Sequence, residues 1–176
     1  QKTEIYEWYR KLWSLTNELE KKGITWEFVN DEALQKATLV NGRLQIEGNA
    51  YKTLVLANLP YIQLATAKKV RELSRLGLNL WTVGELPRKQ PGYFNYKKND
   101  IETTKLIFEA AEMKNCRRIS DPLLLPTVNR KIIFLKDAPF SRQIIREMSD
   151  SSQIRFLWNK SDQWQTITLQ IARTFS

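Results

Sequence analysis

Polar side chains that could carry out acid–base chemistry follow three stretches expected to be β-strands. Asn30, Asp31 and Glu32 follow residues 24–29, Asn58 follows residues 51–57, and Glu85 follows residues 78–83. Ligands of open parallel sheets bind at the carboxyl ends of the strands, where these side chains would meet. Two carboxylates placed there could donate and accept protons. The structural alternative, which we favour, is that Asp31 or Asn30 caps a short helix and Glu85 lies in a solvated loop.

A nucleophile with its base is the second chemistry to consider. Asn58 occupies the strand-to-helix turn where many α/β enzymes carry Ser or Cys, and the chain contains no His to act as a base. The one cysteine, Cys116, permits no internal disulfide and follows an expected helix. We interpret it as a small buried hydrophobic residue. We therefore predict no catalytic residue in this chain.

Cofactor and metal sites have no signature in the sequence. The six glycines are scattered and form neither a dinucleotide-binding nor a phosphate-binding loop. With no His and one Cys, we do not expect zinc or iron. A carboxylate-bound Ca²⁺ or Mg²⁺ stays open, although no spaced Asp/Asn loop predicts one. We predict no cofactor and no metal.

A loop at residues 86–98 combines aromatic rings with cations. Its members of these two kinds are Arg88, Lys89, Tyr93, Phe94, Tyr96, Lys97 and Lys98. Rings among cations can stack on nucleobases or sugars. Two other interpretations stay open: the rings fold back onto the core, or the loop contacts a neighbouring domain. Arg88, Tyr93 and Tyr96 are the candidate binding residues in this loop.

Hydrophobic periodicity predicts the elements that hold these residues. We expect helices at 3–22, 63–76 and 99–114 (capped by Asn99 or Asp100), a helical turn at 32–34, and strands at 24–29, 37–40, 43–47, 51–57, 78–83 and 117–120. Asn41-Gly42 predicts a tight hairpin turn. The strand–helix–strand order predicts an open, mainly parallel α/β sheet flanked by helices, with strand 51–57 in the centre. The first helix should pack on this domain through Trp8, Leu12 and Leu15.

The pattern changes after residue 120 to that of a C-terminal antiparallel β extension. We expect a strand at 131–135, helical turns at 141–148, and a hairpin between 153–158 and 164–171. This predicts four parts, which are a helix at 1–23, an α/β domain at 24–120, a connector at 121–152, and a hairpin at 153–176. The hairpin would belong to a following β-domain or an edge extension.

The bulk composition indicates a folded domain with a basic surface. The chain has 176 residues, of which 42% are hydrophobic, and 28 Lys and Arg against 19 Asp and Glu give a net charge of +9. Such a charge favours an anionic partner, but the cations are dispersed in pairs, as on solvated helix faces. No run reaches the ~18–20 apolar residues of a membrane span. Because the chain begins at Gln1 with neither Met nor a signal peptide, we expect a fragment or a processed product.

Three segments together carry a resemblance to a known family. They are Trp-Glu-Phe-Val-Asn-Asp-Glu-Ala-Leu at 26–34, Lys-Ala-Thr-Leu-Val-Asn-Gly-Arg-Leu-Gln-Ile at 36–46, and Tyr-Lys-Thr-Leu-Val-Leu-Ala-Asn-Leu-Pro at 51–60, which leads to Leu-Ser-Arg-Leu-Gly at 73–77. They resemble the glutamine-amidotransferase-like, flavodoxin-like domain of large rhamnosidase-type glycoside hydrolases. Residues 154–159 and 165–169 are similar to the hairpin that opens the next β-sandwich of that family, but depart from its His-Arg turn.

The resemblance implies a non-catalytic accessory domain of a larger carbohydrate-active enzyme, located in the periplasm or outside the cell. The catalytic carboxylates of that family belong to a separate barrel domain, and true amidotransferases carry a Cys where this chain has Asn58. The implied partners are other domains of the parent enzyme, a second copy of the chain, and carbohydrate through the parent enzyme. The contacting surface would include Asn30, Asn58, Glu85 and the loop 86–98. The alternative is a stand-alone basic module that binds nucleic acid or an anionic polysaccharide.

Overall fold

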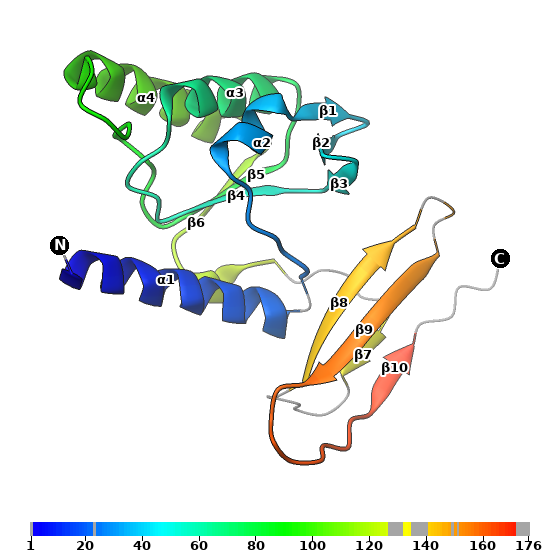
Figure 1. Cartoon of the computed structure of the whole chain (residues 1–176). Helices are drawn as coiled ribbons and strands as arrows, with labels where there is room; N and C mark the ends of the chain where they lie inside the picture. The colour runs from blue at the N-terminus through cyan, green and yellow to red at the C-terminus, as the bar shows by residue number, and fades with distance from the viewer. Residues whose placement is uncertain are drawn as a thin grey trace. The chain divides into compact units, whose positions relative to one another are not determined.

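The computed structural model describes residues 2–22, 24–126, 132–134, 141–148, 150 and 152–171. The helices are α1 (Lys2–Lys21), α2 (Asp31–Lys36), α3 (Leu64–Arg75), α4 (Tyr96–Ala111) and the short 3-10 helix η1 (Pro122–Leu124). The strands are β1 (Thr38–Val40), β2 (Arg43–Ile46), β3 (Asn49–Tyr51), β4 (Leu54–Ala57), β5 (Leu80–Val83), β6 (Cys116–Ile119), β7 (Ile132–Phe134), β8 (Ser141–Glu147), β9 (Gln153–Asn159) and β10 (Leu169–Ile171). Two compact units divide the chain (Figure 1): residues 1–12 with 28–124, and residues 13–27 with 125–176.

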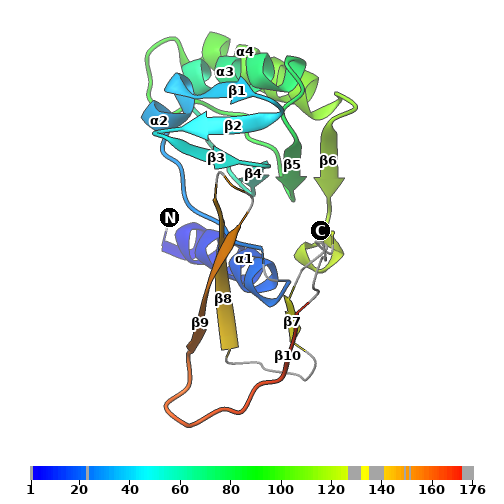
Figure 2. The same ribbon diagram turned by 90° about the vertical axis from the view of Figure 1, so that its right-hand side faces the viewer.

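The first unit is built on a parallel sheet of order β4-β5-β6. Leu54 pairs with Leu80, and Leu80 in turn pairs with Cys116. Helices α3 and α4 pack against each other and lie on one face of this sheet (Figure 2). The prediction of an α/β fold with an open parallel sheet and a C-terminal antiparallel extension is therefore confirmed.

The position predicted for the apolar strand 51–57 was wrong. Its first residue, Tyr51, belongs to β3, and β4 lies at the edge of the parallel sheet while β5 lies between its two neighbours. Burial explains the difference, because β4 buries only Leu54 and Leu56 whereas β5 buries three of its four side chains. An apolar run of this kind does not by itself tell an edge strand from a central one.

An antiparallel meander of β1, β2 and β3 precedes the parallel sheet. Asn41 and Gly42 form the first turn with φ values of 51° and 72°, as a two-residue hairpin with two left-handed positions requires. This turn was predicted from the Asn-Gly pair. Leu44 of β2 is buried and joins the core of the unit.

The core of the first unit lies between the sheet and its helices. Its buried members are Leu34, Ala37, Leu44, Leu54, Leu56, Ile62, Ala67, Val70, Leu73, Leu78, Leu80, Leu106, Ile107 and Ala110. In α3, the residues Ala67, Val70 and Leu73 recur at three-residue spacing, which is the apolar stripe that predicted this helix. Burying such a stripe, rather than helix propensity alone, stabilises a helix of this length.

Two further predictions about the first 100 residues were wrong. Residues 24–30 form no strand, and Phe28 and Val29 are exposed. They have strong β propensity but no partner strand, and propensity without pairing does not make a strand. Helix α4 begins at Tyr96, three residues before the expected cap, and Asn95 with φ 50° takes the cap position without a side-chain bond.

The second unit contains two antiparallel pairs, β8 with β9 and β7 with β10. The predicted strand at 131–135 is present as β7. Residues 141–148 were expected to be helical, and the hairpin was expected to join 153–158 to 164–171. Both predictions were wrong, because β8 is the partner of β9 over seven residue pairs. Side-chain bonds attach this pair to the rest of the unit: Ile145 N–H donates to Thr25 Oγ1 at 3.0 Å and Lys160 pairs with Glu20 at 2.9 Å.

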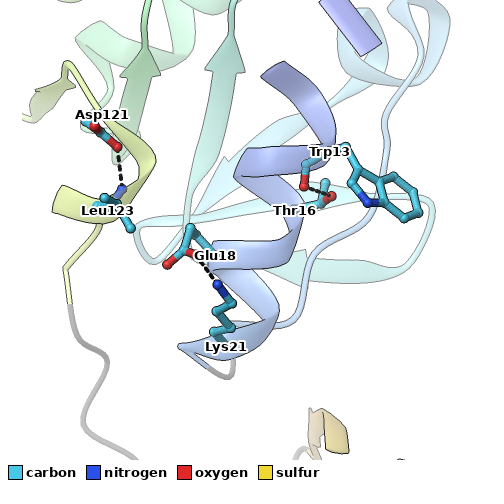
Figure 3. A network of polar contacts seen from close by, with 6 residues as sticks. All are labelled: Trp13, Thr16, Glu18, Lys21, Asp121 and Leu123. Atoms are coloured by element: carbon cyan, nitrogen blue, oxygen red, sulfur yellow. Dashed lines mark hydrogen bonds and ion pairs between the residues drawn. The ribbon is translucent and has the colours of Figure 1, made fainter. Parts of the chain in front are cut away.

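Helix α1 is held by local polar contacts along its last turns. Thr16 Oγ1 donates to the Trp13 carbonyl at 3.1 Å, and Lys21 pairs with Glu18 at 2.7 Å (Figure 3). Leu15 is buried while Trp8 and Leu12 are half-buried. Packing of this helix on the α/β domain, and the four-part division expected above, stay predictions. Neither α1 nor any other helix among the described residues has the length and apolar character to cross a membrane.

Candidate functional site

The carboxyl edge of the parallel sheet is the first candidate site, because three loops begin there. Backbone bonds continue the ladder one residue beyond the strands: Asn58 N–H donates to Val83 O at 2.9 Å, and Gly84 N–H donates to Ile119 O at 3.1 Å. The loops after β4 and β5 therefore leave the sheet side by side. This is the edge at which Asn58 and Glu85 were expected.

The side chain of Asn58 fills the turn that it occupies. Its Oδ1 accepts a hydrogen bond from Glu85 N–H at 3.3 Å, and its amide lies directly against Gly84. Asn58 adopts φ 46° and Gly84 adopts φ 69°, so both turns are left-handed. The functional group at the expected nucleophile position therefore joins β4 to β5. The carboxylate of Glu85 is exposed beside it.

Asn30 and Asp31 have structural roles at the start of α2. Asn30 is the N-cap, and its Oδ1 accepts from Ala33 N–H at 2.8 Å. Asp31 accepts a hydrogen bond from Thr66 Oγ1 in the first turn of α3, and Gln35 Nε2 donates to Thr66 Oγ1 at 2.8 Å. These bonds join α2 to α3. Within the described part of the chain no hydrogen bond or ion pair joins Asp31 to Glu85, so the two carboxylates do not form an acid–base pair.

Backbone and side-chain bonds hold the loop that follows β5. Ile62 N–H donates to Lys89 O at 2.9 Å, next to a parallel β-bridge between Tyr61 and Lys89. The N–H of Gln90 donates to Asp100 Oδ1 at 2.9 Å, and Thr104 Oγ1 donates to the Arg88 carbonyl at 2.9 Å. The loop is thus attached to the preceding loop on one side and to α4 on the other.

The aromatic rings of this loop point into solvent. Tyr93 is 94% exposed, Phe94 82% and Tyr96 45%. The interpretation in which the rings fold back onto the core was therefore wrong. Tyr61, which sequence reasoning missed, adds a fourth exposed ring at 53%. The bridge between Tyr61 and Lys89 and the bond from Ile62 N–H to Lys89 O bring Tyr61 beside this loop, and no local pattern signals such pairing.

The cations of the loop differ in their environment. The guanidinium of Arg88 lies 5.7 Å from the centre of the Phe108 ring, a cation–π contact on α4. Lys89, Lys97 and Lys98 are exposed, and none of them forms an ion pair with another described residue. Three exposed ammonium groups without an ion-pair partner among the described residues thus share this stretch of sequence with the exposed rings.

Cys116 lies at the amino end of β6, at the opposite edge of the sheet from Asn58 and Glu85. Burial of the half-buried thiol raises the pKa of Cys116, and the Thr82 hydrogen bond and the Arg118 charge oppose this only in part. A thiol with a raised pKa is a poor nucleophile at neutral pH. The position and the pKa agree with a packing role.

Residues of α3, of α4 and of the segment just after α4 line an open depression of about 610 Å³. It is lined by Arg71, Arg75, Lys105, Phe108, Glu109, Glu112 and Met113. Arg71 pairs with Glu109 and Glu112 pairs with Arg118, so its acids are compensated. Across the described residues, no group of acids and cysteines is arranged to hold a metal ion.

Comparison with known proteins gave no match to this chain, whether against family models, curated proteins or solved structures.

Proposed function

We propose that this chain is a non-catalytic accessory domain of a larger carbohydrate-active enzyme, a glycoside hydrolase. The family context comes from the segments 26–34, 36–46 and 51–60, which resemble the amidotransferase-like domain of rhamnosidase-type enzymes. The resemblance also implies an exported protein. A parallel α/β unit in this part of the chain is consistent with that resemblance.

The main support for the proposal comes from the contacts that the Asn58 side chain makes. In a working amidotransferase, the residue at this turn must be free to attack a substrate. Here its amide oxygen accepts from Glu85 N–H, and its side chain packs on Gly84. A neutral amide is neither a nucleophile nor a base near neutral pH. The turn that would carry chemistry instead stabilises the sheet, which favours a supporting role for the domain.

A supporting domain needs a surface for its neighbours. The exposed groups of Glu85 and of residues 86–98 offer one that is mixed in character and attached to α4 by hydrogen bonds. Interfaces between domains of one chain are of this mixed kind. On this proposal, the domain contacts other domains of its parent enzyme, or a second copy, through this edge.

Assays of two proteins test the proposal. The 176-residue chain and the full product of its gene are each incubated with aryl glycosides and with glutamine. We expect only a longer gene product to hydrolyse the glycoside, and neither protein to hydrolyse glutamine. Turnover by the purified chain that disappears in Cys116→Ala or Glu85→Gln, but persists in the control Glu47→Gln, would overturn the proposal. If the gene encodes these residues alone, no parent enzyme exists and the proposal is wrong.

A second candidate function is a stand-alone module that binds nucleic acid. The observation in its favour is the exposed Tyr93 and Phe94, close in sequence to Lys97 and Lys98, which form no ion pair with another described residue. Binding to a labelled oligonucleotide would then weaken steeply with salt, with a logarithmic slope of about −0.7 per neutralised phosphate for single strands and about −0.9 for duplex DNA. Tight binding with such a slope would favour this function over the accessory role.

A further inference from the structure

The exposed rings and cations around the loop after β5 form one surface, which we call the loop patch. Its members are Tyr61, Arg88, Lys89, Tyr93, Phe94, Tyr96, Lys97 and Lys98. The two segments that supply them are joined by the Tyr61–Lys89 bridge and by the bond from Ile62 N–H to Lys89 O. The patch is therefore built from the loop after β4, the loop after β5 and the first turn of α4.

The loop patch is held in place before any ligand binds. Pro87, in the same loop, is fully buried, and the Gln90 and Arg88 backbones are bonded to side chains of α4. Asn99 Nδ2 donates to the Phe94 carbonyl at 3.1 Å, which attaches the tip of the loop as well. A surface ordered in advance loses less conformational entropy on binding. Such anchoring raises the affinity available from exposed rings.

Leaving large aromatic rings in water on an anchored loop costs free energy, which is recovered when a ligand or partner covers the rings. Burying one aromatic side chain removes about 150–250 Å² from water. Tyr93 and Phe94 leave most of that area in solvent, with exposures of 94% and 82%. Lys89, Lys97 and Lys98 are exposed in the same stretch of sequence and form no ion pair within the described ranges. The surface is thus complementary to a ligand that has flat apolar faces and negative charges.

We propose that the loop patch binds an acidic polysaccharide, with the rings stacked on sugar faces and the lysines paired with uronate carboxylates. This inference rests on the proposed function, since it supplies a carbohydrate contact to an accessory domain of a carbohydrate-active enzyme. It adds the chemical class of the ligand and the residues that hold it. Tyr93 and Phe94 supply stacking faces, and Lys97 and Lys98 supply charge.

Two features favour a polysaccharide over a nucleic acid. Three of the four rings are tyrosines, whose hydroxyl can bond a sugar hydroxyl while the ring stacks. Glu85 is exposed just before the loop. Its carboxylate repels uronate and phosphate groups alike, but it can accept hydrogen bonds from the ring hydroxyls that each uronate unit carries. A phosphodiester group has no such donor.

Titration of the whole chain with three probes tests the proposal. The probes are an oligogalacturonate, the same oligosaccharide with methyl-esterified carboxyls, and a single-stranded oligonucleotide with the same number of charges. Isothermal titration at fixed salt gives each affinity. We expect the free acid to bind tightest and the ester to bind at least about tenfold more weakly, because esterification removes the charge interaction with the lysines.

Variants locate the binding surface. Tyr93→Ala with Phe94→Ala should weaken oligogalacturonate binding about tenfold or more, because the two most exposed stacking faces of the patch are removed. Lys97→Gln with Lys98→Gln should weaken it too and lower its salt dependence. The matched control combines Tyr6→Ala, Arg75→Gln and Lys105→Gln, an exposed ring and two exposed cations outside the patch. Its affinity should equal that of the wild type.

Three results would overturn the proposal. They are no binding of the oligogalacturonate, equal binding by the Tyr93→Ala, Phe94→Ala variant, and tighter binding of the oligonucleotide, which would favour the nucleic-acid module. Because every substituted side chain is exposed, circular dichroism should show an unchanged fold. These results are separate from the test of the accessory role, which is read from turnover by the gene product, so either proposal can fail alone.

Discussion

The side chain of Asn58 occupies the space that a β-carbon on Gly84 would need. A Cβ built on Gly84 would lie 2.7 Å from Asn58 Cγ, well inside van der Waals contact. Gly84 has φ 69°, a left-handed backbone conformation that residues other than glycine rarely adopt. Glycine is therefore required at this position for two reasons, which are the left-handed backbone conformation and the close approach of the Asn58 side chain. Together they let β4 and β5 end beside each other.

Gly84→Ala should destabilise the first unit by about 2–3 kcal/mol. Roughly 1 kcal/mol comes from the left-handed backbone, and the remainder comes from displacing Asn58 and losing its bond to Glu85 N–H. Gly42→Ala is the matched control, since Gly42 has φ 72° and nothing within 4 Å of its Cβ position. Amide hydrogen exchange in peptides from β4, β5 and β6 reports the free energy of opening.

A double-mutant cycle separates the two causes. In an Asn58→Gly background, the obstacle to Cβ is gone, so Gly84→Ala should cost only about as much as Gly42→Ala. An equal cost of Gly84→Ala in both backgrounds would mean that Asn58 does not hold the edge as described.

Val83→Ala should destabilise the first unit more than Val55→Ala. Val83 lies in β5, is 1% exposed and pairs with both Ala57 and Ile119, whereas Val55 lies in the edge strand and is half-buried. Removing two buried methyl groups from the central strand should cost about 2–3 kcal/mol. The half-buried position should cost about 1 kcal/mol. The same exchange measurement compares them, and a larger effect at Val55 would contradict the observed strand order.

Local sequence patterns predicted most elements of the first unit because their causes are local. The stripe Ala67, Val70, Leu73 specifies α3, and Asn41-Gly42 specifies its hairpin turn. The strand order was not accessible, since an apolar run shows that a strand is buried but not how many neighbours it has. The candidate site was likewise predicted only in part. The segment 86–98 was found, but Tyr61 lies beside it through pairing of residues 61 and 62 with Lys89, which is distant in the sequence.

The strands after residue 130 were predicted poorly, because each of them pairs with a strand that local sequence does not identify. Residues 141–147 contain Arg, Gln and Glu, which favour helix in isolation. They form β8 because β9 pairs with them along its whole length. Likewise β7 and β10 pair although more than thirty residues separate them in the chain. Pairing of this kind overrides propensity, and no spacing in the sequence encodes it.

Asn30→Ala should destabilise the first unit by about 0.5–2 kcal/mol. The substitution removes the acceptor for Ala33 N–H and leaves that donor to water. Asn30→Asp should have little effect or a small stabilising one, since a carboxylate can accept the same bond and interacts well with a helix N-terminus. Exchange of the amides in α2 measures both. Equal stability of Asn30→Ala and the wild type would show that the cap contributes nothing.

Cys116 should be slow to react and should make stability depend on alkaline pH. Burial raises the pKa of Cys116, so less thiolate is present at pH 8 than for an exposed thiol, and iodoacetamide should alkylate the folded chain more slowly than the unfolded chain. Because the folded state favours the neutral thiol, its contribution to stability is fully present below the pKa of the unfolded thiol. It is lost as the pH rises through the higher folded pKa. Wild-type stability should therefore fall more steeply above pH ~9 than that of Cys116→Ala, in which only the other groups titrate. Alkylation of the folded chain as fast as that of the unfolded chain, or parallel pH profiles for the two proteins, would contradict a buried thiol at this edge of the sheet.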